Sequence, residues 1–199
     1  FEEGVIRIIT DDKFDFVKID FYGLLLSAFE GRTKFAIIQA LADYDSNHSH
    51  YLNFNQLLPN GKSFFTHINY RKFKNTCEDN HNIQIPLILF LINKGVDVNK
   101  SDLFGVYPLQ YAIQSHSLPY VETLLNSGKL DFSVRINTKH FTNGTYLHLA
   151  VDSTEEIIRK LISQNIFDLN SKDDLGRTPY MMMSQVHSKS WGNGSLLKL

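Results

Sequence analysis

Two short helical patterns between Gly95 and Gly128 limit what this chain can fold into more than any other feature of its sequence. Each pattern places its apolar residues three or four positions apart, on one helical face: Leu109, Ala112 and Ile113 in the first, and Val121, Leu124 and Leu125 in the second. Each glycine follows an apolar run, where a left-handed residue commonly ends a helix, and Pro108 suits a first helical turn. Two such helices cannot bury their apolar faces alone, so they need a neighbour of the same kind on each side.

The same arrangement recurs along the chain. Three segments open the predicted first helices: Tyr107-Pro108-Leu109-Gln110-Tyr111-Ala112, Thr145-Tyr146-Leu147-His148-Leu149-Ala150 and Thr178-Pro179-Tyr180-Met181-Met182-Met183. They match the Thr-Pro-Leu-His-x-Ala opening of an ankyrin repeat, the second of them best. Asp97 and Asp131, which take up the same place in successive repeats, are 34 residues apart, close to the ~33 of that family. The chain therefore resembles an ankyrin repeat protein over residues 17–190, most clearly in the third to fifth repeats.

The resemblance implies an all-α ankyrin-repeat solenoid of about five helix-turn-helix repeats with β-hairpin turns. Residues 1–16 are predicted to be an N-terminal capping segment, and residues 17–199 the repeat array. The repeats are predicted at about 17–51, 52–99, 100–133, 134–170 and 171–199. An insertion at 71–82 separates the two helices of the second repeat. The segment 133–143 alternates in polarity and predicts an enlarged β-hairpin.

The motif residues themselves are expected to join the repeats. Thr145 and Thr178 stand where a hydroxyl can cap a first helix, which contributes ~1 kcal/mol. In the ankyrin family the Thr and His of the motif connect neighbouring repeats by hydrogen bonds. His148 retains that role, whereas Thr66, Gln110 and Met181 are expected not to reproduce it fully. The run Met181 to Met183 is expected to pack in the core and between repeats.

Composition excludes several classes of function. The formal net charge of -1 gives no general attraction to nucleic acid or to an anionic membrane. Cys77 is the only cysteine, which excludes a disulfide framework and favours a reducing compartment. No apolar run reaches the ~18 residues of a membrane span. We therefore expect an intracellular, cytoplasmic protein, with a nuclear location left open, and no nucleic acid partner. Because the chain begins with Phe1, we also expect it to be a fragment of a larger ankyrin-repeat-containing protein.

Histidine and cysteine side chains are the candidates for a metal site or a catalytic thiol. His48 and His50 lie in a polar loop near Asp43 and Asp45, but a zinc site needs three or four ligands at suitable spacing. Cys77 could pair with His67 or His81, yet no family signature of a thiol nucleophile surrounds it. We expect no metal, no cofactor and no catalytic residue.

Two further segments partly resemble motifs for nucleotide or nucleic acid binding. Gly61-Lys62-Ser63 contains part of a phosphate-binding loop, but Gln56 stands where that motif requires its first glycine. The insertion carries a small basic and aromatic cluster: Tyr70, Arg71, Lys72, Phe73 and Lys74. Nucleic acid recognition usually needs a wider basic face, so a solvated loop or a contact with an acidic protein remains the favoured interpretation.

The resemblance implies a non-catalytic protein-protein interaction module, a scaffold or adaptor. Such modules bind through the hairpin tips and the concave surface of the first helices. Carried onto this chain, the partner-binding residues are Asn69, Tyr70, Lys100, Ser101, Asp102, Phe104, Ile113, Gln114, Arg135, Asn137, Lys139, His140, Val151, Asp152, Asp173, Asp174, Ser184 and Gln185. The partner is a protein that the sequence does not identify. The alternative is a substrate-recruiting array of a larger enzyme or secreted effector whose catalytic domain lies outside these residues. A third is the cytoplasmic array of a membrane protein.

Overall fold

The computed structural model describes residues 53–67 and 81–187, together with the separate positions 23, 36, 39, 40, 42, 43 and 46. The chain divides into two compact bodies. The N-terminal body is Phe1–Val106 and the C-terminal body is Tyr107–Leu199. The predicted cap at 1–16, most of the first repeat and insertion residues 71–80 lie outside the described residues.

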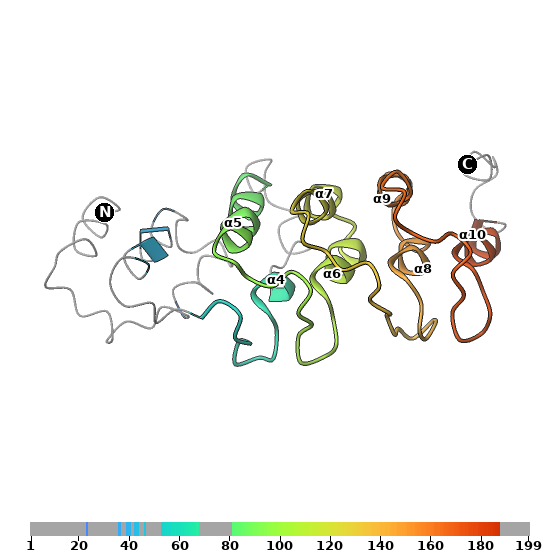
Figure 1. Ribbon diagram of the computed structural model, residues 1–199, viewed down its shortest axis with the longest axis horizontal. Coiled ribbons are helices and arrows are strands. Elements are labelled where there is room, and N and C mark those ends of the chain that lie inside the picture. Colours follow the sequence, from blue (N-terminus) through green and yellow to red (C-terminus); the bar gives the residue numbers. More distant parts are fainter. Residues whose placement is uncertain are drawn as a thin grey trace, which may run out of the picture. The chain divides into compact units, whose positions relative to one another are not determined.

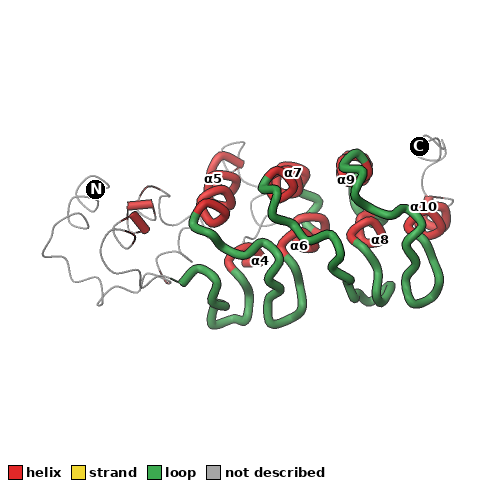
Figure 2. The backbone as a smooth tube through the Cα atoms, in the orientation of Figure 1, coloured by secondary structure: helices red, strands yellow, loops and turns green. Residues whose placement is uncertain are grey.

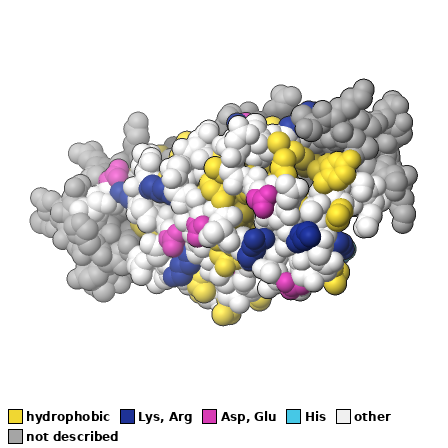
Figure 3. Space-filling view, turned by 45° about the vertical axis from the view of Figure 1, so that its right-hand side comes forward, with side chains coloured by type: hydrophobic (Ala, Val, Ile, Leu, Met, Phe, Trp, Pro, Cys, Tyr) yellow, Lys and Arg dark blue, Asp and Glu magenta, His cyan; other side chains and the backbone are white. Residues whose placement is uncertain are grey.

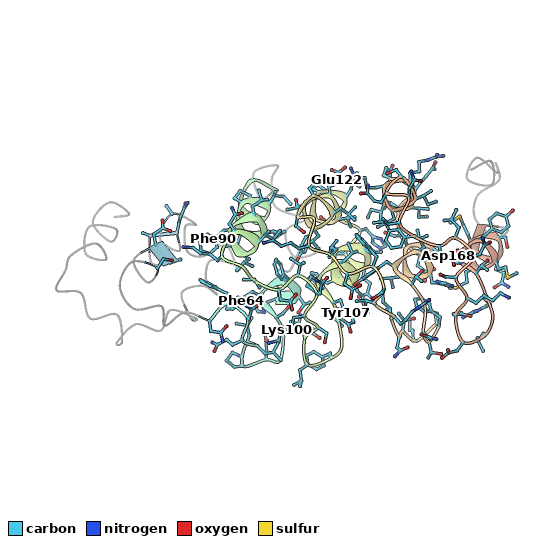
Figure 4. The ribbon with its side chains drawn as sticks, in the orientation of Figure 1. Phe64, Phe90, Lys100, Tyr107, Glu122 and Asp168 are labelled. Atoms are coloured by element: carbon cyan, nitrogen blue, oxygen red, sulfur yellow. The ribbon has the colours of Figure 1, made fainter. Side chains whose placement is uncertain are left out.

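Residues 53–67 and 81–106 of the N-terminal body contain two helices, α4 (Phe64–His67) and α5 (His81–Asn93). The ring of Phe54 packs edge-on against the rings of Phe64 and Phe90, with centroids 6.0 and 5.8 Å apart (Figure 4). This contact joins the loop before α4 to both helices. Helix α5 ends as predicted before Gly95, whose φ of 77° lies in the left-handed region.

The described part of the C-terminal body consists of two complete helix pairs and the first helix of a third. The helices are α6 (Pro108–Gln114), α7 (Leu118–Asn126), α8 (Tyr146–Ala150), α9 (Glu155–Ile162) and α10 (Pro179–His187). Within this body α6, α8 and α10 follow one another in a row, and α7 and α9 lie on one side of that row (Figure 1). The loops that precede α8 and α10 lie on the other side (Figure 2).

Local chemistry explains why these short helices form. Pro108, Pro119 and Pro179 all lie in a first turn, where the missing N–H removes no helical hydrogen bond. In α9, Glu155 and Glu156 lie in the first turn, and Arg159 and Lys160 lie in the last turn. This distribution of charge is in accord with the helix dipole. The aliphatic side chains that the sequence predicted as apolar faces are buried: Leu109, Ala112, Ile113, Val121, Leu124 and Leu125. In α9, Ile157, Ile158 and Leu161 are buried as well.

The all-α ankyrin fold is confirmed, but its turns carry less β structure than the sequence suggested. Where a hairpin was predicted at 133–143, the chain forms one antiparallel bridge, between Ile136 and Gly144. The Ile136 N–H donates to the Gly144 carbonyl at 2.8 Å, and the Gly144 N–H donates to the Ile136 carbonyl at 3.0 Å. The Asn137 side chain accepts the Asn143 N–H at 2.8 Å and thereby closes the loop. No longer ladder forms among residues 81–187.

Candidate functional site

The loop before α6 is held by the carboxylate of Asp102, which points inward. One carboxylate oxygen accepts the N–H groups of Phe104 and Val106, both at 2.9 Å. The Asp102 N–H donates to the Val106 carbonyl at 3.0 Å, and Gly105 takes a φ of 73° between them. A buried carboxylate thus satisfies the N–H groups of a tight turn and fixes the backbone under the exposed side chains of Leu103 and Phe104.

The loop before α10 repeats this geometry. Asp173 accepts the N–H groups of Leu175 and Arg177 at 3.0 and 2.8 Å, and Gly176 has a φ of 73°. The Arg177 guanidinium also binds the second oxygen of Asp173 through two nitrogens, at 2.9 and 2.8 Å. Burial raises the pKa of Asp173, but the hydrogen bonds and charge of Arg177 outweigh it and lower the pKa overall. The carboxylate therefore stays ionised and keeps the loop closed.

A side chain from the preceding first helix joins each loop. Thr66 on α4 accepts the Ser63 N–H at 3.1 Å and donates its hydroxyl to Asp102 at 2.8 Å. His148 on α8 accepts the Thr145 N–H through Nδ1 at 3.0 Å, which places its proton on Nε2. Nε2 then donates to the Arg177 carbonyl at 2.9 Å. Burial lowers the pKa of His148, consistent with a neutral ring.

Neighbouring loops also bond directly to each other. The Leu103 N–H donates to the Gly61 carbonyl at 2.8 Å in the N-terminal body. In the C-terminal body the Asp174 N–H donates to the Thr142 carbonyl at 3.1 Å. The Arg177 guanidinium donates to the His140 carbonyl at 2.8 Å. These bonds restrict each loop through its neighbour, so the tips present their side chains from a fixed backbone.

Most of the predicted contact residues lie at the surface. Those that are exposed are Lys100, Phe104, Gln114, Arg135, Asn137, Lys139, His140, Asp152, Asp174, Ser184 and Gln185, and Ser101 is half-buried. The Lys100 ammonium, labelled in Figure 4, donates to the Asn55 carbonyl at 2.7 Å. Asn69 and Tyr70 lie outside the described residues.

Four predicted contact side chains are buried, which corrects their assignment to the surface. Asp102 and Asp173 turn inward because their carboxylates bind the N–H groups of their own loops. Ile113 and Val151 are buried in the packing of the first helices. None of the four offers a side chain to a partner in this structure.

Sequence reasoning missed two exposed apolar residues at the loop tips. Leu103 and Leu175 are both exposed, next to the exposed Phe104 in one loop and Asp174 in the other. The available signal was the shared spacing Asp-x-x-Gly, which places two residues at the outer end of a tight turn.

Reactive groups form no cluster in the described part of the chain. No set of three or more His, Cys, Asp or Glu residues is placed to hold a metal ion among the described residues. His67 contacts the Asn60 amide at 3.1 Å, and Cys77, His48 and His50 lie outside the described residues. No described helix has the length and apolar character needed to cross a membrane.

Comparisons with known proteins agree with this architecture. Residues 75–173 match the family model described as ankyrin repeats in three copies, and no match is found among the curated proteins. Among solved structures, the chain is similar to the ankyrin repeat domain of Bcl-3, described as a unique member of the IkappaB protein family. The identity is 22%, the TM-score is 0.61, and the match covers 79% of this chain and 61% of that one. The repeated helix pairs, their linked loops and the family match together show that this chain is an ankyrin repeat protein.

Proposed function

We propose that this chain is a non-catalytic protein-binding module whose contacts lie on the loop tips and on the exposed ends of the first helices. Ankyrin repeats are generally protein–protein interaction modules. The observation that carries the proposal is the exposure of Leu103, Phe104 and Leu175 on loops with a fixed backbone. Exposed apolar side chains on an ordered, polar-rimmed surface commonly mark an interaction site.

Rigid display is the proposed mechanism. The Asp102 and Asp173 carboxylates, the Thr66 and His148 ties and the bonds between loops order the tips before any partner arrives. Ordering a loop on binding opposes association, so a loop ordered in advance loses less free energy. Phe104 and Arg135 are of the large aromatic and arginine types that dominate binding energy at interfaces.

The loops of the C-terminal body carry exposed positive charge of their own. Arg135, Lys139 and Lys172 are exposed on its two loops and form no ion pair with another described residue. The charge of Arg177 is balanced by Asp173, and Asp168 and Asp174 are exposed carboxylates of the segment between α9 and α10. Figure 3 shows Lys and Arg side chains on the face turned forward, with Asp and Glu side chains among them and hydrophobic side chains beside them. We infer that the partner offers carboxylates near an apolar side chain.

Capture from cell lysate followed by affinity measurement tests the proposal. The full chain and the Phe104→Ala/Arg135→Ala variant are immobilised, and proteins retained by the first but not by the second are identified. We expect the dissociation constant of such a protein to rise about tenfold or more in the variant. Circular dichroism should show an unchanged fold, because both side chains are exposed.

A matched control variant tests whether the loss of affinity is specific to the loop tips. The Ile166→Ala/Arg159→Ala variant removes the same kinds of side chain, an exposed apolar residue and an exposed arginine, from α9 and the segment after it. Its affinity for the captured protein should equal that of the unmodified chain. Equal affinity of the loop-tip variant and the unmodified chain would refute the proposed surface.

A further inference from the structure

The structure describes two Asn-Gly pairs, Asn60-Gly61 and Asn143-Gly144, and a third in the sequence, Asn193-Gly194, lies outside the described residues. An asparagine before a glycine can react with its own backbone. The glycine has no side chain to obstruct its nitrogen, which can therefore approach the amide carbon of the asparagine. Whether this happens in a folded protein depends on the groups around the amide, and those groups differ between the two described pairs.

The groups around the Asn60 amide favour such a reaction. The amide oxygen accepts the Lys62 N–H at 3.1 Å, and this bond stabilises the negative charge that the oxygen gains when its carbon is attacked. The same bond directs the amide nitrogen towards His67 at the end of α4. That nitrogen lies 3.1 Å from Nδ1 of His67, which is close enough for direct proton transfer. Asn60 is exposed, so water reaches the product of the attack.

The nucleophile of this reaction is the backbone nitrogen of Gly61. Gly61 has a φ of 78°, a left-handed conformation that glycine adopts without steric cost. Its N–H donates to the Leu58 carbonyl at 2.8 Å, so the nitrogen attacks only when that bond opens. A bond within a surface loop opens at a lower free energy than one in the core.

The Asn143 amide lies in a different environment. Its nitrogen donates to the Asp174 carboxylate at 3.0 Å, and a carboxylate has no proton to give to a leaving nitrogen. The Gly144 N–H and carbonyl are both bonded to Ile136 in the antiparallel bridge. Gly144 is buried against the Phe141 ring. Attack at this pair requires the bridge to break, so the structure protects it.

We propose that Asn60 is a site of self-catalysed deamidation in which His67 carries the proton. The Gly61 nitrogen loses its proton and forms a bond to the amide carbon of Asn60. His67 takes up that proton and passes it to the amide nitrogen, which leaves as ammonia and closes a succinimide ring. Water then opens the ring at one of its two carbonyl carbons, which gives aspartate or isoaspartate at this position.

The reaction changes the support of the neighbouring loop tip. The Gly61 carbonyl accepts the Leu103 N–H at 2.8 Å, and the Leu103 side chain lies against Gly61. Both products add a negative charge beside this contact, and isoaspartate also inserts one carbon into the backbone before Gly61. The inference concerns the chain's own atoms and is independent of the protein partner proposed above.

Incubation of the full chain at neutral pH tests the proposal. Mass spectrometry of proteolytic peptides follows deamidation at each asparagine, with a fragmentation method that separates isoaspartate from aspartate. In urea, where the fold is lost, the two Asn-Gly pairs should react at similar rates. In the folded chain we expect Asn60 to react about tenfold or more faster than Asn143. Similar rates at the two sites in the folded chain would overturn the proposal.

A variant of His67 tests its role in proton transfer. His67→Gln retains a side chain that forms hydrogen bonds but cannot carry a proton. We expect it to slow deamidation of Asn60 about tenfold in the folded chain and to have no effect in urea. A substitution that only loosened the loop would instead make the reaction faster. His140→Gln, a change of an exposed histidine near the other pair, is the matched control and should alter neither rate.

An unchanged or higher rate at Asn60 in folded His67→Gln contradicts the role of His67 and overturns the proposal. Circular dichroism checks that both variants are folded. The comparison of Asn60 with Asn143 in the unmodified chain does not depend on either variant.

Discussion

In α4 and in α8, the fourth residue of the helix-opening motif joins the helix to the loop that follows. Thr66 and His148 are chemically different, yet each accepts an N–H from the start of its own helix and donates a proton to the next loop. The sequence predicted this role for His148 and not fully for Thr66. Thr66 fulfils it because Asp102 brings an acceptor to the hydroxyl, which a motif comparison does not reveal.

The neutral state of His148 makes the stability of the C-terminal body depend on pH. Burial holds the pKa of His148 in the folded chain below the ordinary value of 6.5. As the pH falls from 6.5 towards that lower pKa, the unfolded chain binds a proton before the folded chain does, and stability decreases. His148→Gln should flatten this dependence and retain the fold, because Gln110 already accepts the Tyr107 N–H at the same position.

Urea denaturation of both proteins between pH 7.5 and pH 5 measures the effect. The relevant quantity is the difference in unfolding free energy between the chain and its His148→Gln variant, since other groups titrate in both. A difference that stays constant across this range would show that His148 does not carry the pH dependence.

At the scale of the element, the loops were harder to predict than the helices. Spacing of apolar residues located α6 and α7, because a helix buries one face with a regular period. Asp102 and Asp173 were predicted at the surface because the resemblance places them at hairpin tips. Their burial depends on N–H groups that point inward only once Gly105 and Gly176 have turned the backbone.

The inward carboxylate should therefore matter more for stability than the exposed residue beside it. Asp102→Ala leaves the N–H groups of Phe104 and Val106 and the Thr66 hydroxyl without their acceptor. We expect a loss of about 2–3 kcal/mol in unfolding free energy. Leu103→Ala, in the same loop, should change it by no more than about 0.5 kcal/mol. Equal effects of the two substitutions in chemical denaturation would contradict this account of the loop.

At the scale of the whole molecule, the sequence predicted repeats that bury one another, and the C-terminal body shows that packing directly. Helix pairs α6–α7 and α8–α9 contact each other through both their first and their second helices. What the sequence could not predict is which motif residues remain uncovered, because Tyr180 and Leu147 occupy the same place in the pattern. Leu147 is 2% exposed, whereas Tyr180 is 58% exposed. Met181, which was expected from the sequence to be packed, is also at the surface.

A cavity between two repeats should weaken this body as a whole. Leu125 is buried on α7, and Leu125→Ala removes packing that the neighbouring helices share. We expect a loss of ~2–5 kcal/mol in the free energy of unfolding, read from urea denaturation. Ile166→Ala, at an exposed apolar position, is the matched control and should leave the midpoint unchanged. An unchanged midpoint for Leu125→Ala would place that side chain outside the core.

The bonds from Thr66 and His148 both run in one direction, from a helix to the loop that comes later in the sequence. Within the C-terminal body, α10 is therefore anchored through its preceding loop but sends no such bond onward from Met181. Opening of α8 should therefore release the loop before α10 as well, because it breaks the bond from His148 to the Arg177 carbonyl. Opening of α10 beyond Thr178 breaks no such bond.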